Sequence, residues 1–274
     1  MSSQRVFVVT GSNRGIGFAI VKGLAERVSN GIVYLTSRKV EDGEKSVAEI
    51  KKTLGDKMTS EVRAIQLDIT DEASGKRLAD HLQKTHGGFD VLVNNAGFAF
   101  HNDATEPAHV QAEVTIGINY YGTRLVSSIL TPLIRSGGRV VNICSMAGIM
   151  TGRYSQGLID LLHNPNVSIA DVDKFVENYK ELAKCDGRKA GGYPESAYMV
   201  SKAAEIALTM SQARELKPKG VKVNGCCPGY VATNMSNFKG PLTIEEGADT
   251  PLYLALDANA PDGEFVKDRK ITVW

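Results

Sequence analysis

Short apolar runs alternate with longer amphipathic stretches from the beginning of the chain. The apolar runs predict strands over 6–10, 32–37, 62–67, 91–94 and 139–144. The stretches between them carry apolar residues at helical spacing and predict helices over 15–28, 41–54, 71–85 and 110–134. Apolar strands separated by helices indicate a parallel sheet that is buried on both faces, with right-handed crossovers. We therefore expect an α/β fold with a doubly wound, Rossmann-type parallel sheet.

The alternation breaks after Ser145, and no strand pattern occurs from 146 to 195. Within this stretch a helical pattern opens at Ser168 and runs to Ala183, with the apolar residues Val172, Phe175, Val176, Tyr179 and Leu182. The loop 187–194 closes it. The alternation then resumes with a helix over 196–216, a strand over 221–226, a helix over 244–256 and a short strand-like tail. We expect one domain over 1–274 that contains a helical insertion at about 146–195.

The composition of the 274-residue chain is that of a globular protein, with 42% hydrophobic and 23% charged residues. Its 32 Lys and Arg residues balance 31 Asp and Glu residues, so no overall field favours a nucleic-acid partner. No apolar stretch is long enough to span a membrane. Two of the four cysteines, Cys226 and Cys227, are adjacent, a poor arrangement for disulfides or metal ligation. We expect reduced thiols, no metal and a cytoplasmic location.

Three glycines lie where the first strand gives way to the first helix. Gly11, Gly15 and Gly17 have the spacing G-x-x-x-G-x-G. Glycines at such a turn let the backbone approach a pyrophosphate, whose charge the helix N-terminus favours. We predict a dinucleotide site that uses Gly11, Asn13, Arg14, Gly15, Ile16 and Gly17. The alternative is a tight strand–helix turn without a ligand.

The end of the second strand indicates which dinucleotide binds. An acidic residue there would accept hydrogen bonds from the ribose of NAD. The chain instead has Thr36, Ser37, Arg38 and Lys39 at this place. Arg38 and the Arg14 of the glycine loop can converge on a 2′-phosphate. This arrangement favours NADP(H), unless Arg38 and Lys39 are only solvated loop residues.

Tyr198 and Lys202 are four residues apart, which places both side chains on one face of a helix. An ammonium beside a phenol stabilises the phenolate, so we expect the pKa of Tyr198 to lie below its usual value of about 10. Such a phenol can protonate the oxygen of a carbonyl group that accepts a hydride, and Ser145 is the candidate second hydroxyl. The alternatives are an ordinary amphipathic pair and a serine that caps a turn.

Four motifs together resemble the short-chain dehydrogenases/reductases: the glycine loop, Asn-Asn-Ala-Gly at 94–97, Ser145, and Tyr-x-x-x-Lys at 198–202. The resemblance covers nearly the whole chain. The insertion, the start Met-Ser-Ser and the segment Asn-Gly-Cys-Cys-Pro-Gly at 224–229 are most similar to the cytosolic carbonyl reductases that use NADPH. The resemblance implies a Rossmann-type fold and NADPH-dependent reduction of aldehydes, ketones or quinones, with Tyr198 as the proton donor.

The resemblance also implies roles for residues outside the glycine loop. Asn119 is implied as a fourth catalytic residue that helps to hold water at Lys202, unless it is an ordinary helix asparagine. The further cofactor contacts implied are Asp68, Ile69, Asn95, Ala96, Gly97, Tyr198, Lys202, Pro228, Gly229, Val231 and Thr233. The substrate contacts implied are Ser145, Tyr198 and Tyr230. For Asp68, a turn at a strand end is the alternative.

Two departures from the resembled pattern leave the substrate open. Tyr230 stands where a tryptophan is expected in vertebrate carbonyl reductases, and Cys144 replaces a serine. Cys227 either lines the substrate pocket or is a small buried hydrophobe, and Cys185 is expected at the surface. Two alternative functions stay open: a reductase with one steroid, prostaglandin or pterin substrate, and a non-catalytic NADP-sensing protein.

The insertion also bears on assembly. The resemblance implies that simpler members of the family form dimers through the helix that carries Tyr-x-x-x-Lys. The insertion enters just before that helix, and its apolar stripe must be buried somewhere. We therefore expect a monomer whose insertion covers the dimer face, with a small-molecule carbonyl substrate as the partner. The alternative is a substrate lid that leaves the dimer face free.

Overall fold

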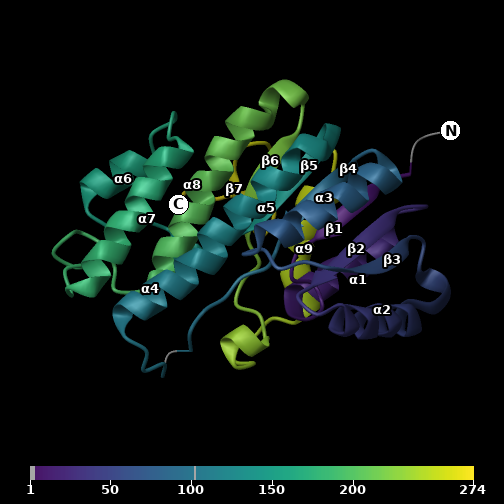
Figure 1. The fold of residues 1–274 in the computed structure, drawn as a ribbon, viewed down its shortest axis with the longest axis horizontal. Coiled ribbons are helices and arrows are strands. Elements are labelled where there is room, and N and C mark those ends of the chain that lie inside the picture. Colours follow the sequence, from purple (N-terminus) through teal and green to yellow (C-terminus); the bar gives the residue numbers. More distant parts are fainter. Residues whose placement is uncertain (1–3, 102) are drawn as a thin grey trace.

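In the computed structural model, which describes residues 4–101 and 103–274, the chain forms one eight-stranded sheet with the order β3-β2-β1-β4-β5-β6-β7-β8 (Figure 1). The strands are β1 (Val6–Val9), β2 (Ile32–Ser37), β3 (Glu61–Gln66), β4 (Phe89–Asn94), β5 (Ile134–Ile143), β6 (Lys222–Cys227), β7 (Phe265–Lys267) and β8 (Lys270–Ile271). Neighbouring strands pair in parallel except β8, which runs antiparallel to β7. This order confirms the doubly wound parallel sheet expected from the sequence.

Helices cover both faces of the sheet (Figure 1). They are α1 (Gly15–Arg27), α2 (Val40–Leu54), α3 (Glu72–His86), α4 (Ala108–Ile116), α5 (Thr123–Leu130), α6 (Gln156–Leu162), α7 (Ile169–Lys184), α8 (Ala197–Leu216) and α9 (Ile244–Leu256). The helices α1, α2 and α9 lie on one face, and α3, α5 and α8 lie on the other. Because both faces are covered, every residue of β1 and β2 is buried.

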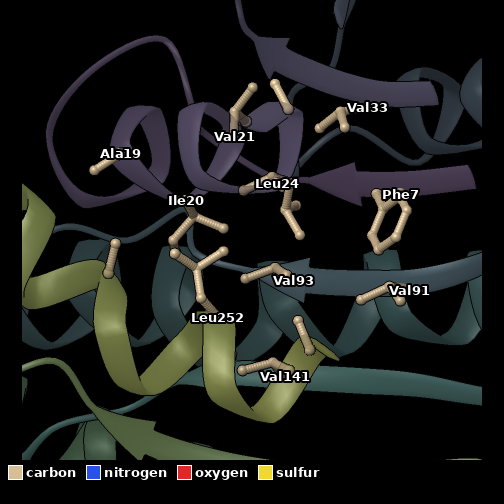
Figure 2. Close-up of a cluster of buried hydrophobic side chains, with 14 of the residues drawn as sticks. Phe7, Ala19, Ile20, Val21, Leu24, Val33, Val91, Val93, Val141 and Leu252 are labelled. Atoms are coloured by element: carbon tan, nitrogen blue, oxygen red, sulfur yellow. The ribbon is translucent and has the colours of Figure 1, made fainter. Parts of the chain in front are cut away.

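The core on the face of α1 and α9 is shown in Figure 2. Ile20 and Leu24 of α1 and Leu252 of α9 meet Phe7 of β1 and Val93 of β4. Burying one aliphatic or aromatic side chain of this size stabilises a fold by about 1.5–3 kcal/mol. The strands are thus firmly supported where their carboxyl ends carry the loops described below.

The long helix predicted over 110–134 is confirmed, because the chain is helical without a break from 108 to 133, but it is not a regular α-helix throughout. The chain forms α4, a π-helical segment Gly117–Gly122 and α5, and β5 already begins at Ile134. A Cβ on Gly122 would lie 2.9 Å from the Ile69 side chain, so this close approach needs a glycine. Pro132 lacks an N–H group and lies in a 3₁₀ turn that leads directly into β5.

The insertion between β5 and α8 contains α7, as predicted, and α6, which the sequence pattern did not predict. The helix α7 begins with a capping box between Ser168 and Asp171. The helix lies beside α4 and α8 (Figure 1). Its apolar stripe packs with residues of these two helices in one hydrophobic cluster. At the border of this cluster the Tyr121 hydroxyl donates a hydrogen bond to Glu177 (2.6 Å). The insertion is therefore buried against the helices that flank it.

Among the described residues, no helix combines the length and the apolar composition needed to cross a bilayer. In the same ranges, no three His, Cys, Asp or Glu side chains come together as a metal site. The four cysteines are free, with Cys144, Cys226 and Cys227 buried and Cys185 exposed on the insertion.

Candidate active site

The glycine loop lies between the end of β1 and the start of α1, against the end of β4. It holds the predicted contacts Gly11, Asn13, Arg14, Gly15, Ile16 and Gly17. A Cβ on Gly11 would lie 2.8 Å from Cα of Ala96, and one on Gly17 would lie 2.8 Å from Cα of Ser12. Gly11 and Gly15 have φ angles of +58° and +60°, a region that other residues rarely adopt. The glycines leave the loop backbone bare, so a ligand can approach its N–H groups.

Asn95 and Thr10 tie this loop to the end of β4. The Nδ2 group of Asn95 donates to the carbonyl oxygens of Thr10 (2.9 Å) and Gly11 (3.0 Å). The Thr10 hydroxyl accepts the N–H groups of Asn95 and Ala96, both at 2.9 Å. At the end of β2, the Thr36 hydroxyl accepts the Gly11 N–H at 3.1 Å. Three strand ends therefore hold the loop in one conformation.

The N-terminus of α1 is open to an anion. Its N-cap residue Arg14 forms no side-chain cap, and the first turn of α1 carries no acidic residue. The first N–H groups of a helix are free to bind a negatively charged ligand. The guanidinium groups of Arg14 and Arg38 belong to exposed side chains at this end of the sheet. The bare loop, the open helix end and the two arginines fit a dinucleotide with a 2′-phosphate.

Asp68 and Ile69, which follow β3, are both engaged in the fold. Oδ1 of Asp68 accepts the N–H (2.9 Å) and the hydroxyl (2.7 Å) of Thr70. These bonds form the strand-end turn that was the alternative for Asp68. The Ile69 side chain is 7% exposed and packs against Gly122. A contact of Asp68 and Ile69 with an adenine stays a prediction.

Ser145, Tyr198 and Lys202 come together at the carboxyl end of β5. The Ser145 hydroxyl accepts the N–H of Ala147 (3.1 Å) and, through its effect on the nearby phenol, lowers the pKa of Tyr198 against the effect of burial. Nζ of Lys202 lies 5.7 Å from the centre of the Tyr198 ring. Ser145 and Tyr198 are partly exposed, whereas Lys202 is only 5% exposed. The Ser145 and Tyr198 residues thus lie partly at the surface, and the ammonium is buried beside them.

The Lys202 ammonium is held from two sides. It donates to the carbonyl oxygen of Ile143 at the end of β5 (2.9 Å), and it lies 2.5 Å from Oε2 of Glu205. Burial alone lowers the pKa of Lys202, but the Glu205 carboxylate outweighs burial, so the pKa of Lys202 is raised overall. The ammonium therefore keeps its charge although it is buried.

The expectation that the ammonium lowers the pKa of Tyr198 below about 10 is wrong. Burial disfavours the phenolate and raises the pKa of Tyr198 above its usual value, although Lys202 opposes this shift. Glu205 adds to the rise because its negative charge repels a phenolate. Tyr198 is therefore protonated at neutral pH, which is the state that a proton donor requires.

Asn119 connects the segment after β4 to α8. Its Oδ1 accepts the N–H of Phe98 (2.7 Å), and its Nδ2 donates to the Phe98 carbonyl and the Ser201 hydroxyl, both at 2.9 Å. A Cβ on Gly97 would lie 3.3 Å from Oδ1 of Asn119 and 3.8 Å from Nζ of Lys202. Both polar groups therefore border the same small space over Gly97.

The loop after β6 lies next to the glycine loop. It carries the predicted contacts Pro228, Gly229, Tyr230, Val231 and Thr233. A Cβ on Gly15 would lie 3.5 Å from the methyl group of Thr233, which shows how closely the two loops approach. Val231 is 4% exposed, whereas Tyr230 is 57% exposed.

Cys227, beneath this loop, is buried, and its sulfur accepts the Gly229 N–H at 3.4 Å.

Comparison with known families decides what this arrangement belongs to. The sequence profile described as short chain dehydrogenase matches residues 5–156 and 187–241. The chain belongs to the short-chain dehydrogenase family. The unmatched stretch between the two ranges contains nearly all of α6 and α7, which agrees with an insertion into the family fold.

Relatives within this family include proteins named as reductases. Carbonyl reductase (NADPH) 3 of Rattus norvegicus is 40% identical over 281 residues, which cover 100% of this chain and 99% of that protein. Carbonyl reductase (NADPH) 1 of Macaca fascicularis is 41% identical with the same coverage. The solved structure of salutaridine reductase from Papaver somniferum has a TM-score of 0.85 and 31% identity, and the match covers 97% of this chain and 100% of that one. These relatives confirm the resemblance inferred from the motifs.

The motifs of a short-chain dehydrogenase did not reveal every residue that shapes this site. Thr10 and Thr36 fix the glycine loop, and Glu205 pairs with Lys202, but none of the three was predicted. A signal for Glu205 exists in the sequence. It is the one acidic residue in the otherwise uncharged run 203–210, and it follows Lys202 by three positions, on the same helical face.

Proposed function

We propose that this chain is an NADPH-dependent carbonyl reductase that converts aldehydes, ketones or quinones into alcohols or hydroquinones. The observation that carries the proposal is the meeting of Ser145, Tyr198 and Lys202 at the edge of the sheet that also bears the glycine loop. The names of the relatives, carbonyl reductase (NADPH), support both the cofactor and the reaction.

The cofactor site uses backbone and cationic groups. The glycine loop and the N-terminus of α1 would bind the pyrophosphate, and Arg14 and Arg38 the 2′-phosphate. The other proposed contacts are Asp68, Ile69, Asn95, Ala96, Gly97, Tyr198, Lys202, Pro228, Gly229, Val231 and Thr233. A bound nicotinamide would supply the hydride for the carbonyl carbon.

The proton comes from the protein. Ser145 and Tyr198 supply the two hydroxyls beside Lys202, and both would donate hydrogen bonds to the carbonyl oxygen as it gains negative charge. Tyr198 then gives up its proton, and the Lys202 ammonium stabilises the phenolate that remains. Asn119 holds the main chain of Phe98 and the hydroxyl of Ser201, the residue before Lys202, and would help to hold water there. Tyr230, exposed on the loop after β6, is the proposed additional substrate contact.

We further propose that residues 1–274 form one NADP-binding domain, which is a monomer in the cytoplasm. The buried stripe of α7 supports the monomer, because it covers the surfaces of α4 and α8 within the chain. Four free cysteines support a reducing compartment. Cell fractionation would test the location, and recovery only in an oxidising compartment would contradict it.

NADPH oxidation by the purified protein tests the proposed reaction. The substrates are an aromatic aldehyde, an aliphatic ketone, a quinone and steroid, prostaglandin and pterin carbonyls, each measured by the loss of nicotinamide absorbance. We expect turnover of several aldehydes, ketones or quinones. Turnover of a single steroid, prostaglandin or pterin would favour the narrow alternative, and no oxidation with any carbonyl would contradict the proposal.

A further inference from the structure

A buried carboxylate stands directly behind the proposed reaction centre. Glu205 lies in α8, three residues after Lys202, and its side chain is 2% exposed. Oε2 lies 2.5 Å from the Lys202 ammonium, and Oε1 lies 3.5 Å from the Thr123 hydroxyl. Apart from the ammonium, Oε2 has no hydrogen-bond partner among the described residues. Lys202 is therefore the main partner of this carboxylate.

Such a carboxylate is unfavourable for folding unless its partner compensates for lost hydration. Removing an ionised carboxylate from water costs several kcal/mol, and a buried ion pair recovers this cost only with close geometry and further hydrogen bonds. Here the further bonds are on the lysine side, where the ammonium also donates to Ile143. Glu205 itself has only the distant Thr123 hydroxyl. An apolar residue would satisfy packing at this place, so a carboxylate there calls for a role in the site.

We propose that Glu205 is a positioning residue for the reaction centre, whose carboxylate orients the Lys202 ammonium and offsets part of its charge. The inference rests on the proposed function, because it assigns Tyr198 as the proton donor. Glu205 acts through Lys202 and does not touch the substrate. With the carboxylate present, the buried pair has no net charge, and the phenol of Tyr198 is next to a dipole instead of a lone cation.

The expected consequence concerns the proton of Tyr198. A lone buried ammonium favours the phenolate, whereas a paired one favours it less. The titratable groups that face Glu205 or Tyr198 in the described ranges are Lys202 on α8, the Cys144 thiol after β5 and the Cys227 thiol at the end of β6. The Cys226 thiol of β6 faces Lys202 and the other two thiols. Burial raises the pKa of the Cys144 and Cys226 thiols, so these two are neutral. Burial raises the pKa of Glu205 to about 7, although Lys202 opposes this shift. Above that pH, Glu205 is thus the negative charge that keeps the Tyr198 proton in place to higher pH.

The test is the pH dependence of catalysis by Glu205→Gln, which removes the charge but keeps the shape of the side chain. Reduction of 4-nitrobenzaldehyde with NADPH requires the protonated phenol, so kcat/KM falls as pH rises through the pKa of Tyr198. In Glu205→Gln we expect this fall to occur at least about one pH unit lower than in the wild type. Oxidation of the matching alcohol with NADP⁺, which requires the phenolate, should gain activity at correspondingly lower pH.

Three further variants make the result specific. Glu215→Gln removes an exposed carboxylate from the same helix, about 15 Å further along its axis, and should leave the profile unchanged. Glu205→Asp keeps the charge at a greater distance from Lys202. The pH at which its kcat/KM falls should therefore lie between the values for the wild type and Glu205→Gln. If circular dichroism shows that Glu205→Gln does not fold, Glu205→Asp is used instead. The measured quantity is then the difference between Glu205→Asp and the wild type in the pH at which kcat/KM falls. Tyr198→Phe provides the reference for the absorbance titration described next, because it lacks the phenol whose pKa is measured.

Titration of Tyr198 without substrate separates this inference from the proposed function. Tyrosinate absorbance is recorded against pH, and the curve of Tyr198→Phe is subtracted. A titration of Tyr198 at lower pH in Glu205→Gln supports the inference even if the protein reduces no carbonyl at all. A folded Glu205→Gln whose kinetic fall and Tyr198 titration both coincide with the wild type, or move to higher pH, would overturn the inference while leaving the reductase intact.

Discussion

At the scale of single residues, competing electrostatic effects determine the state of the Tyr198 phenol. Burial and the Glu205 carboxylate favour the neutral phenol, and the Lys202 ammonium favours the phenolate. The first two prevail, so the pKa of Tyr198 is raised and the phenol keeps its proton at neutral pH. A donor of this kind suits reduction, in which the product oxygen must be protonated, because the phenol is ready in its acidic form at neutral pH.

The exposed arginine after β2 leads to a prediction about cofactor choice. Ser37→Asp combined with Arg38→Leu should weaken NADPH and improve NADH, since repulsion of the 2′-phosphate replaces attraction. Loss of a charge-assisted hydrogen bond is worth about 1.5–3 kcal/mol, so the preference for NADPH should fall about 10- to 100-fold. The ratio of kcat/KM for the two cofactors measures it, with Arg27→Leu at the far end of α1 as the control. If the ratio of kcat/KM for the two cofactors is unchanged, the 2′-phosphate does not bind at Ser37 and Arg38.

Residue spacing predicted partners that are close in the chain but not the effects of burial. The four-residue interval between Tyr198 and Lys202 correctly put the two side chains together. The pKa of Tyr198 was predicted in the wrong direction because the depth of the phenol depends on β5, β6 and α8 together, which no local pattern specifies. The same holds for Thr10 and Thr36, whose roles depend on which strands are neighbours.

At the scale of elements, the strongly periodic segments were predicted well and the junctions were not. The helices at 15–28 and 196–216 and the insertion helix opening at Ser168 all occur. The long helix predicted over 110–134 also occurs, but its π-helical middle was not predicted. In that middle, Gly122 lies close to Ile69, a contact between residues that are distant in sequence. The helix α6 has only seven residues, too few for a clear period.

The docking of α7 gives a prediction about stability. Phe175 is 1% exposed and lies on the buried side of α7, so Phe175→Ala should lower the free energy of unfolding by about 3–5 kcal/mol. Lys174→Ala, at the exposed neighbouring position, should change it by no more than about 0.5 kcal/mol. Urea unfolding followed by circular dichroism measures both. Equal stability of the two variants would mean that α7 does not pack as described.

At the scale of the whole molecule, the insertion gives α4 and α8 a polar exterior. The apolar side of α7 is buried against them, and its outer side carries the exposed residues Lys174, Asn178, Glu181 and Lys184. A surface of this kind has little apolar area to bury against a second copy. The net charge of +1 likewise provides no overall field that would attract a nucleic acid.

Sedimentation equilibrium tests the assembly. The proposed monomer has a mass of 29.5 kDa. Replacing residues 159–189 by a short glycine–serine linker exposes the apolar faces of α4 and α8, so the shortened chain should dimerise. A mass of about 59 kDa, twice the 29.5 kDa of one chain, for the unaltered protein would refute the monomer. A folded, shortened chain that stays monomeric would refute the covering role of the insertion.

The steady-state kinetics of Tyr198→Phe, combined with titration of NADPH binding, test the central claim most directly. Removing the phenolic hydroxyl takes away the proton donor but none of the proposed phosphate contacts. We expect kcat for carbonyl reduction to fall about 100- to 10,000-fold with nearly unchanged NADPH affinity. Lys202→Ala should damage both, and Tyr253→Phe on α9 should damage neither. Near-normal turnover by Tyr198→Phe would contradict the account.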